Sequence, residues 1–262
     1  MVAVVSLKGG VGKTTVALGL AGASLDRGWR TLVVDLDPQA NATTGLAPTK
    51  VVLTANDVLA DGGPARLSEA VVPSGWDDLV DVVPSEPALE HRNRTGAKEH
   101  RLRGAMEGLA DYGLVVLDCP PSLGGLTTSA LTAAHVALVV TEPTIFAITG
   151  AQQALAAVYE VRRGFNLRLQ PAGIVVNRFR PRSAEHRFRL DELVQAYDGL
   201  VLPETLPERA AVVAAQSAGV PVQRWPAPGA RQVGRVLNGY LDRVLAAASA
   251  GRGSLGRSGR RP

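Results

Sequence analysis

Six short apolar runs limit what this chain can fold into more than any other feature of its sequence. They are built mainly from Val, Leu and Ile and lie at 2–6, 30–37, 78–85, 113–120, 136–143 and 172–179. A continuous apolar run, unlike an alternating one, indicates a strand that is buried on both faces. Patterns typical of helices fill several gaps, notably 123–134, 147–163 and 184–197. Together they predict an α/β fold, a mostly parallel, twisted sheet with helices on both faces.

The length and composition suit one domain. The chain has 262 residues, of which 46% are hydrophobic and 4% aromatic, so we expect a core of Ala, Val and Leu. Two stretches rich in Gly, Pro, Thr and Asn, 41–56 and 61–77, predict loops around one short helix. Residues 249–262 have little apolar content and four arginines. We therefore expect an ordered domain over 1–248 and a basic, disordered tail over 249–262.

Charge and cysteine content bear on partners and compartment. The net charge of +4 and the pI of about 9.6 permit a polyanionic partner without establishing one. Cys119 is the only cysteine, which excludes disulfides and multi-thiolate metal sites and agrees with a reducing cytoplasm. No apolar run approaches the roughly 18 to 20 residues that span a bilayer. The apolar start leads directly into a glycine loop, unlike a signal peptide, so we expect a cytoplasmic protein.

The stretch SLKGGVGKTT, at 6–15, joins the first predicted strand to the first predicted helix. The pattern G-x-x-x-x-G-K-[ST] is incomplete, because Leu7 stands where its first glycine is required. The remaining glycines still allow backbone N–H groups to turn inward around a phosphate, and the helix N-terminus adds positive potential. Lys13 is placed to reach the β- and γ-phosphates, Thr14 to bind Mg²⁺ and Thr15 to reach the α-phosphate. The stretch therefore predicts a P-loop NTPase.

Four stretches carry a resemblance to one family. KGGVGKTT at 8–15 resembles the deviant Walker A motif of the ParA/MinD ATPases, and VVDLDPQANATTGL at 33–46 resembles their second motif. VVLDCPPSLGGLTTSALTAA at 115–134 is similar to their Walker B segment, and LPERAAVVAAQSAGVPV at 206–222 to their late loop. The resemblance covers roughly residues 1–246 and is strongest to the short ParA-type (Soj-like) partition ATPases. It implies that 1–248 is a ParA-type P-loop ATPase domain that uses ATP and Mg²⁺.

The resemblance also gives the first lysine a role. Lys8 matches the family's signature lysine, which reaches across a dimer interface to the phosphates of the partner's nucleotide. Two ATP molecules are then held between two subunits, so that ATP acts as both ligand and adhesive. The physics agrees, because burying the charge of ATP between two protein faces is costly without local cations. Taken alone, Lys8 could equally be a solvated loop lysine.

Other roles follow from the matched positions. The resemblance implies that Asp37 orients the attacking water and that Asp118 holds Mg²⁺ through water. Asp35 would support the magnesium shell or the loop, and a purely structural role is equally open. Asn177 would contact the adenine, and Pro207 lies where the late loop covers the base. Cys119, beside Asp118, has no matching His or Asn arrangement for a nucleophile.

The expected site residues form three groups. Those expected to hold the nucleotide are Lys8, Gly9, Gly10, Val11, Gly12, Lys13, Thr14, Thr15, Asn177 and Pro207. Those expected to act in catalysis are Lys8, Lys13 and Asp37. Those expected at the metal are Thr14, Asp118 through water and, as one option, Asp35.

Two partner surfaces compete within the resembled family. The ParA branch binds DNA without sequence preference, whereas the MinD branch binds membrane through an amphipathic C-terminal helix. The end of this chain, GRGSLGRSGRRP, has no apolar stripe and argues against membrane. Arginines gather instead in positions that could neutralise DNA phosphates: Arg178, Arg180, Arg182, Arg187, Arg189 and Arg224. A merely solvated arginine-rich surface remains open, since the late region LPETLPERAAVVAAQ lacks the basic residues that relatives often carry.

The resemblance therefore implies an ATPase that dimerises with ATP, binds DNA non-specifically and partitions chromosomes or plasmids. Hydrolysis would be slow and stimulated by a ParB-like partner, and the protein would lie on the nucleoid when ATP-bound. Alternatives left open are a ParA-like ATPase that positions protein cargo and a MinD-like, membrane-associated regulator of the division site. A scaffold that binds ATP but hydrolyses it poorly is less favoured, since Lys13 and Asp37 are both present.

Overall fold

The computed structural model describes residues 1–61, 63–94, 99–109 and 111–253. Its strands are β1 Val2–Val5, β2 Thr31–Asp35, β3 Val72–Pro73, β4 Val80–Val83, β5 Leu114–Asp118, β6 Val136–Thr141 and β7 Gln170–Val176. They form one sheet of order β3-β4-β2-β5-β1-β6-β7. Every pair is parallel except β3 with β4. The six predicted strands are confirmed, and the antiparallel edge strand β3 is an addition.

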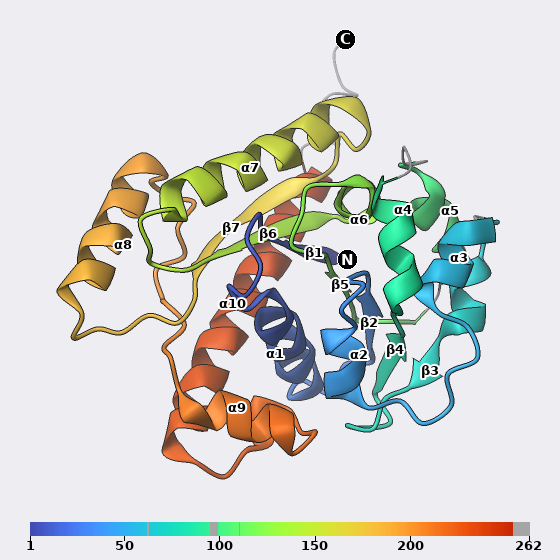
Figure 1. Cartoon of the computed structure of the whole chain (residues 1–262), viewed down its shortest axis with the longest axis horizontal. Helices are drawn as coiled ribbons and strands as arrows, with labels where there is room; N and C mark the ends of the chain where they lie inside the picture. Colours follow the sequence, from blue (N-terminus) through green and yellow to red (C-terminus); the bar gives the residue numbers. More distant parts are fainter. Residues whose placement is uncertain (62, 95–98, 110, 254–262) are drawn as a thin grey trace.

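The helices cover both faces of this sheet, as predicted (Figure 1). They are α1 Lys13–Leu25, α2 Asn41–Leu46, α3 Ala55–Asp61, α4 Glu90–Arg94, α5 Arg101–Ala105, α6 Gly125–Ala133, α7 Ala147–Gly164, α8 Ala184–Ala196, α9 Ala210–Ser217 and α10 Pro228–Gly253. Three 3₁₀ turns, η1 Arg66–Ala70, η2 Pro87–Leu89 and η3 Val222–Arg224, complete the described elements.

Strand β1 shows why the apolar runs are continuous. Ala3 and Val5 pack into the core under α3, α5, α6 and α7, whereas Val2 and Val4 pack into the core under α1, α9 and α10. All four side chains are fully buried. Because successive strand residues point to opposite faces, a strand between two helix layers needs apolar residues at every position.

The segment 41–56, predicted as loop, contains the short helix α2, so that prediction is wrong there. Its sequence NATTGL is a poor helix former, and tertiary contacts supply what propensity lacks. Thr43 donates from both its backbone N–H and its hydroxyl to Asp35 Oδ2, at 2.8 and 2.7 Å. Trp76 Nε1 donates to the Gly45 carbonyl at 2.7 Å, and Leu46 is fully buried. These contacts hold α2 against the end of β2.

The C-terminal helix α10 packs along α1 beneath the sheet (Figure 1). A Cβ added at Gly19 of α1 would lie 2.5 Å from a Leu237 methyl group, so the two helices approach closely there. The helix continues to Gly253, so residues 249–253 of the expected tail are helical and the boundary at 248 is not a break in structure. The rest of the expected tail, 254–262, lies outside the described residues.

The central strands bring three loops to one edge of the sheet. Strand β5 lies between β2 and β1, and Asp118 is paired with Asp35 and with Val4 in register. The carboxyl ends of β1, β2 and β5 therefore meet, which is where ligands bind in open α/β sheets.

Candidate nucleotide site

The glycine loop between β1 and α1 turns sharply into the helix. Gly10 and Gly12 have φ of 80° and 86°, a conformation that favours glycine. At Gly12, space forbids a side chain as well, because an added Cβ would lie 2.1 Å from Asn177 Nδ2. The loop therefore needs glycine at this position for both conformation and close approach.

The phosphate loop lines a cavity of about 470 Å³. Its lining combines the phosphate-loop residues with polar groups from the β2–α2 segment and α9: Gly9, Gly10, Gly12, Lys13, Thr14, Thr15, Leu18, Asp37, Gln39, Asn41, Thr44, Gly45, Pro121, Arg178, Gln216 and Ser217. The expected phosphate-binding residues Gly9 to Thr15, apart from the buried Val11, thus line one cavity.

A buried cation and buried carboxylates face one another in this region. Lys13 is 5% exposed at the first turn of α1, and Asp118 is fully buried at the end of β5. Burial raises the pKa of Asp118, and the neighbouring charge of Asp35 raises it further, whereas the Thr14 hydroxyl and Lys13 act in the opposite direction. The carboxylate is therefore held where its charge is costly without a cation.

The donor set at Asp118 fits Mg²⁺. Thr14 Oγ1 donates to Asp118 Oδ2 at 2.7 Å, while the buried Oδ1 has no hydrogen-bond partner. An unpartnered buried carboxylate oxygen beside a hydroxyl is the kind of oxygen pair that a magnesium shell uses, directly or through water. Among the described residues no group of three or more His, Cys, Asp or Glu could hold an ion alone. That agrees with a shell completed by phosphates and water.

Asp37 and Asp35 differ in how many hydrogen bonds their carboxylates accept and in whether they line the cavity. Asp37 is 4% exposed and lines the cavity, and its Oδ1 accepts the Gln39 N–H at 3.0 Å. Asp35 accepts N–H groups from Asp37 and Thr43 and the Thr43 hydroxyl, within 3.1 Å. Its two oxygens thus organise the turn after β2. Burial raises the pKa of Asp35, and the Thr43 bonds oppose that rise. Of the two readings left open for Asp35, the structure favours the structural one.

The two residues expected at the base, Asn177 and Pro207, are both buried. Asn177 is 4% exposed, and its Nδ2 donates to the Val11 carbonyl at 2.7 Å. Pro207 is buried and forms a β-bridge with Phe179. Neither residue is among those lining the cavity. One N–H of the Asn177 amide thus holds a carbonyl of the phosphate loop.

Lys8 lies apart from the other loop residues. It is exposed, and it lines a second hollow, of about 310 Å³, shared with Glu142, Phe146 and others. The Ser6 hydroxyl donates to the Lys8 carbonyl at 2.9 Å, which shapes the turn that presents the side chain. Within the described part of the chain the Lys8 side chain makes no ion pair, so its charge is available to a partner.

Most arginines predicted to face DNA are engaged with carboxylates. The ion pairs are Arg178 with Glu142, Arg180 with Glu208, Arg189 with Glu185 and Glu192, and Arg224 with Asp77. Arg187 donates to the Pro181 carbonyl at 2.7 Å. Arg182 is exposed. The cluster is therefore less positive than its sequence indicates, since local acids offset much of its charge.

Cys119 is inert. It is fully buried, and burial together with the charge of Asp118 raises the pKa of its thiol well above the usual range. A thiol that stays protonated is a poor nucleophile.

Sequence reasoning missed the polar wall of the cavity. Gln39, Asn41 and Thr44 belong to the stretch already recognised as a motif, so that stretch carried the signal. Gln216 of α9 donates to Thr15 Oγ1 at 3.3 Å across 201 residues, and no local pattern marks such a contact. Arg178 was assigned to a DNA surface, yet it lines this cavity.

Comparisons with known proteins agree with this geometry. A family model described as an AAA domain matches residues 1–171. The chromosome partitioning protein ParA of Caulobacter vibrioides is 34% identical over 231 residues, which cover 85% of each chain. The chromosome-partitioning ATPase Soj of Thermus thermophilus is 35% identical over 254 residues, 93% of this chain and 96% of that one.

A solved structure shares the fold and carries a nucleotide. Cobyrinic acid a,c-diamide synthase from Mycobacterium smegmatis, with bound ATP analog and magnesium, superposes with a TM-score of 0.76 at 30% identity. The match covers 90% of this chain and 92% of that one.

Proposed function

This chain belongs to the ParA family of P-loop partitioning ATPases, and from that premise we propose that it works as an ATP-switched dimer in chromosome or plasmid partition. Its cofactors are ATP and Mg²⁺. In the proposal, the ATP-bound dimer holds DNA without sequence preference, and a ParB-like partner stimulates slow hydrolysis. The protomers then separate and leave the DNA. The protein would act in the cytoplasm and lie on the nucleoid while ATP is bound.

The position of Lys8 carries the proposal. Two lysines flank the same glycine loop, but Lys13 lines the nucleotide cavity and Lys8 lines the neighbouring hollow. Next to Lys8's hollow, Ile145 and Phe146 are 64% and 66% exposed, which is unusual for large apolar side chains. A cation beside exposed apolar groups suits a face that a second copy covers. Lys8 would then supply charge to the partner's phosphates only when the dimer forms.

The remaining residues divide the work within one protomer. The loop N–H groups, the start of α1 and Lys13 would bind and orient the phosphates. Thr14 and Asp118 would hold Mg²⁺, which when bound neutralises charge on the phosphate oxygens. Asp37 would position the attacking water, and positioning rather than strong basicity is what phosphoryl transfer requires.

The turn after β2 holds Asp37 in place through two hydrogen bonds. Its Oδ1 accepts the Gln39 N–H, and its carbonyl accepts the Ser85 hydroxyl at 2.7 Å. The carboxylate is thus oriented by its own turn before any substrate arrives. A partner that shifts this turn would change the rate without supplying a new catalytic group.

In the proposal, fewer of the arginines in segment 178–189 bind DNA than the sequence indicated. Arg182 and Arg187 are exposed, and among the described residues neither forms an ion pair with a carboxylate. Arg231 and Arg235 are exposed one turn apart on α10, and they too form no ion pair with another described residue. Unpaired guanidinium groups gain more from phosphate contact than paired ones, which must first leave a carboxylate.

One experiment tests dimer and surface together. Light scattering and DNA gel shifts are measured with ATP, ADP and no nucleotide, for the unmodified chain and for Lys8→Ala, and the binding assay is repeated with anionic liposomes. The proposal expects dimers and DNA binding with ATP alone, both lost in Lys8→Ala, which still binds ATP. A chain that stays monomeric with ATP contradicts the dimer, and liposome binding without DNA binding contradicts the partition role.

Among the described residues, no helix combines the length and apolarity needed to cross a bilayer.

A further inference from the structure

Arg178 belongs to two hollows at once. It lines the cavity formed by the phosphate loop, and it lines a smaller hollow of about 240 Å³ together with Glu142, Arg180, His186 and Glu208. Arg178 lies two residues after Val176, the last residue of β7. The residue therefore borders the nucleotide site and also begins the arginine-rich segment.

The backbone at this point is held rigidly against the phosphate loop. The Asn177 N–H donates to the Thr141 carbonyl at 2.8 Å, and the Asn177 side chain donates to Val11 of the loop. Arg178 itself has φ of 53°, a left-handed conformation that non-glycine residues rarely adopt. Such conformations gather at functional sites, where the surroundings fix them. The main chain thus keeps Arg178 beside the loop, and its side chain is the part that can move.

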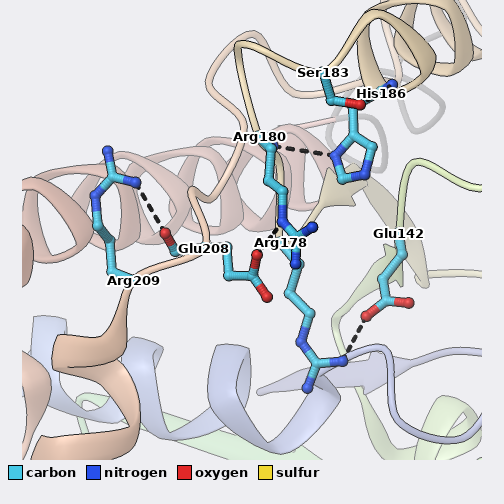
Figure 2. Close-up of polar contacts among 7 residues, drawn as sticks. All are labelled: Glu142, Arg178, Arg180, Ser183, His186, Glu208 and Arg209. Carbon is cyan, nitrogen blue, oxygen red and sulfur yellow. Dashed lines mark hydrogen bonds and ion pairs between the residues drawn. The ribbon is translucent and has the colours of Figure 1, made fainter.

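The guanidinium is held now by one carboxylate. Arg178 Nη1 donates to Glu142 Oε1 at 2.8 Å, with the arginine side chain 53% exposed and the glutamate 16% exposed. Figure 2 shows the arginine extended toward Glu142, away from the Arg180–Glu208 pair. Glu208 is thus occupied by Arg180, and Arg180 also donates its backbone N–H to His186 Nδ1 at 3.1 Å. Glu142 is the partner that a ligand of Arg178 would displace.

We propose that Arg178 is a nucleotide-contacting residue, and that the phosphates of the bound nucleotide take its guanidinium from Glu142. A guanidinium offers the same forked donors to a carboxylate and to a phosphate. The arginine side chain is 53% exposed, so water screens this ion pair and limits the stability that it adds. The bound phosphates carry more negative charge than one carboxylate. The inference uses the nucleotide site alone and is independent of the proposed dimer and DNA surface.

The proposed exchange predicts that substitutions of Arg178 and of Glu142 change nucleotide affinity in opposite directions. Removing the arginine removes a phosphate contact, so Arg178→Ala weakens nucleotide binding. Removing the charge of its competitor frees the arginine, so Glu142→Gln strengthens nucleotide binding. A purely structural ion pair predicts the same sign for both, because either change loosens the same contact. The double variant separates the two cases further, since Glu142→Gln has nothing to release once the arginine is absent.

The test is a calorimetric titration of the full chain with ADP and Mg²⁺, a nucleotide that avoids ATP-driven dimerisation. We expect about 10-fold weaker binding in Arg178→Ala and about 3-fold tighter binding in Glu142→Gln. We expect no effect of Glu142→Gln on top of Arg178→Ala. Matched controls are Arg163→Ala and Glu160→Gln, both exposed on α7 and away from the cavity. Their affinities should equal that of the unmodified chain.

Melting temperatures without nucleotide check that each variant is folded. Weaker binding in Glu142→Gln, or unchanged binding in Arg178→Ala, overturns the inference. If the unmodified chain binds normally and Lys13→Ala does not, failure of the Arg178 prediction leaves the nucleotide site intact. If Lys13→Ala binds normally, the site assignment itself fails.

Discussion

The phosphate-loop edge of the sheet and the arginine-rich segment 178–189 both concentrate charge, but they hold it differently. At the edge, Lys13 and Asp118 are buried, and one oxygen of Asp118 has no partner. In the segment, Arg180 and Arg189 are paired with acids at the surface, where water screens them. A buried charge with an unpartnered oxygen gains from a bound cation, whereas Arg180 and Arg189 already have acids beside them.

The contrast explains why one region could be interpreted from its sequence and the other could not. The glycine loop needs certain residue types at certain spacings, because a phosphate must be met by backbone N–H groups, a lysine and a hydroxyl. An arginine run has no such requirement. Its charge depends on which acids the fold brings near, as with Glu208, which is 28 residues from Arg180.

The largest effect should follow from Lys13→Ala. Lys13 is a buried cation in the cavity, so its loss should weaken ADP·Mg²⁺ binding roughly 100-fold or more. Titration calorimetry measures this, and the exposed Lys50→Ala is the matched control. Near-normal affinity in Lys13→Ala would contradict the idea that the buried charge at the phosphate loop serves to bind a ligand.

The next effect concerns turnover. Asp37→Ala should keep ATP binding but lower hydrolysis by roughly 100-fold, because it removes the group that positions water. ATP-bound dimers should persist on gel filtration where those of the unmodified chain decay. Asp191→Ala, exposed on α8, should hydrolyse normally. Equal turnover in Asp37→Ala would assign the water-positioning role elsewhere.

A third prediction concerns pH and metal removal. The folded state raises the pKa of Asp118, so ionising it costs stability, and the metal-free chain should lose stability as pH rises from the ordinary aspartate value through the raised one. In EDTA without nucleotide, Asp118→Asn should therefore melt about 2 to 4 °C higher than the unmodified chain at pH 8. The gap should close toward pH 4.

Adding Mg²⁺ and ADP should reverse that order, since the ion favours the ionised carboxylate and the amide binds it poorly. Thermal melts of both chains at pH 4 and pH 8, in EDTA and with Mg²⁺ and ADP, measure these differences. A pH-independent gap would mean that the variant changes packing and not charge.

The smallest expected effect is on DNA affinity, and it differs between arginines that form ion pairs and arginines that do not. Arg182→Gln with Arg187→Gln should weaken DNA retention several-fold and lower the slope of log affinity against log salt by about two. Arg180→Gln with Arg189→Gln should do less, because those guanidinium groups must first leave their carboxylates. Filter binding between 50 and 200 mM salt measures both slopes. Equal losses in the two pairs would show that the ion pairs do not matter for DNA.

Much of the fold could be predicted from sequence. All six predicted strands are present, since an unbroken Val and Leu run can only be buried between two layers. Helix α2 was missed because NATTGL has weak helix propensity and is held by Asp35, and β3 because it has two residues, one of them proline, and depends on pairing with β4. Helix α10 also extends five residues into the expected tail.

For the site, the sequence by itself determined which loop residues line the cavity, because the loop is local: consecutive residues at a strand end and a helix start. Only the tertiary structure decided what the other charged and polar groups do. It placed Asn177 against Val11, gave Asp35 to Thr43 and set Arg178 between Glu142 and the nucleotide cavity. The physical reason is that an interaction between distant residues depends on the positions of two elements, and no spacing within either element records it.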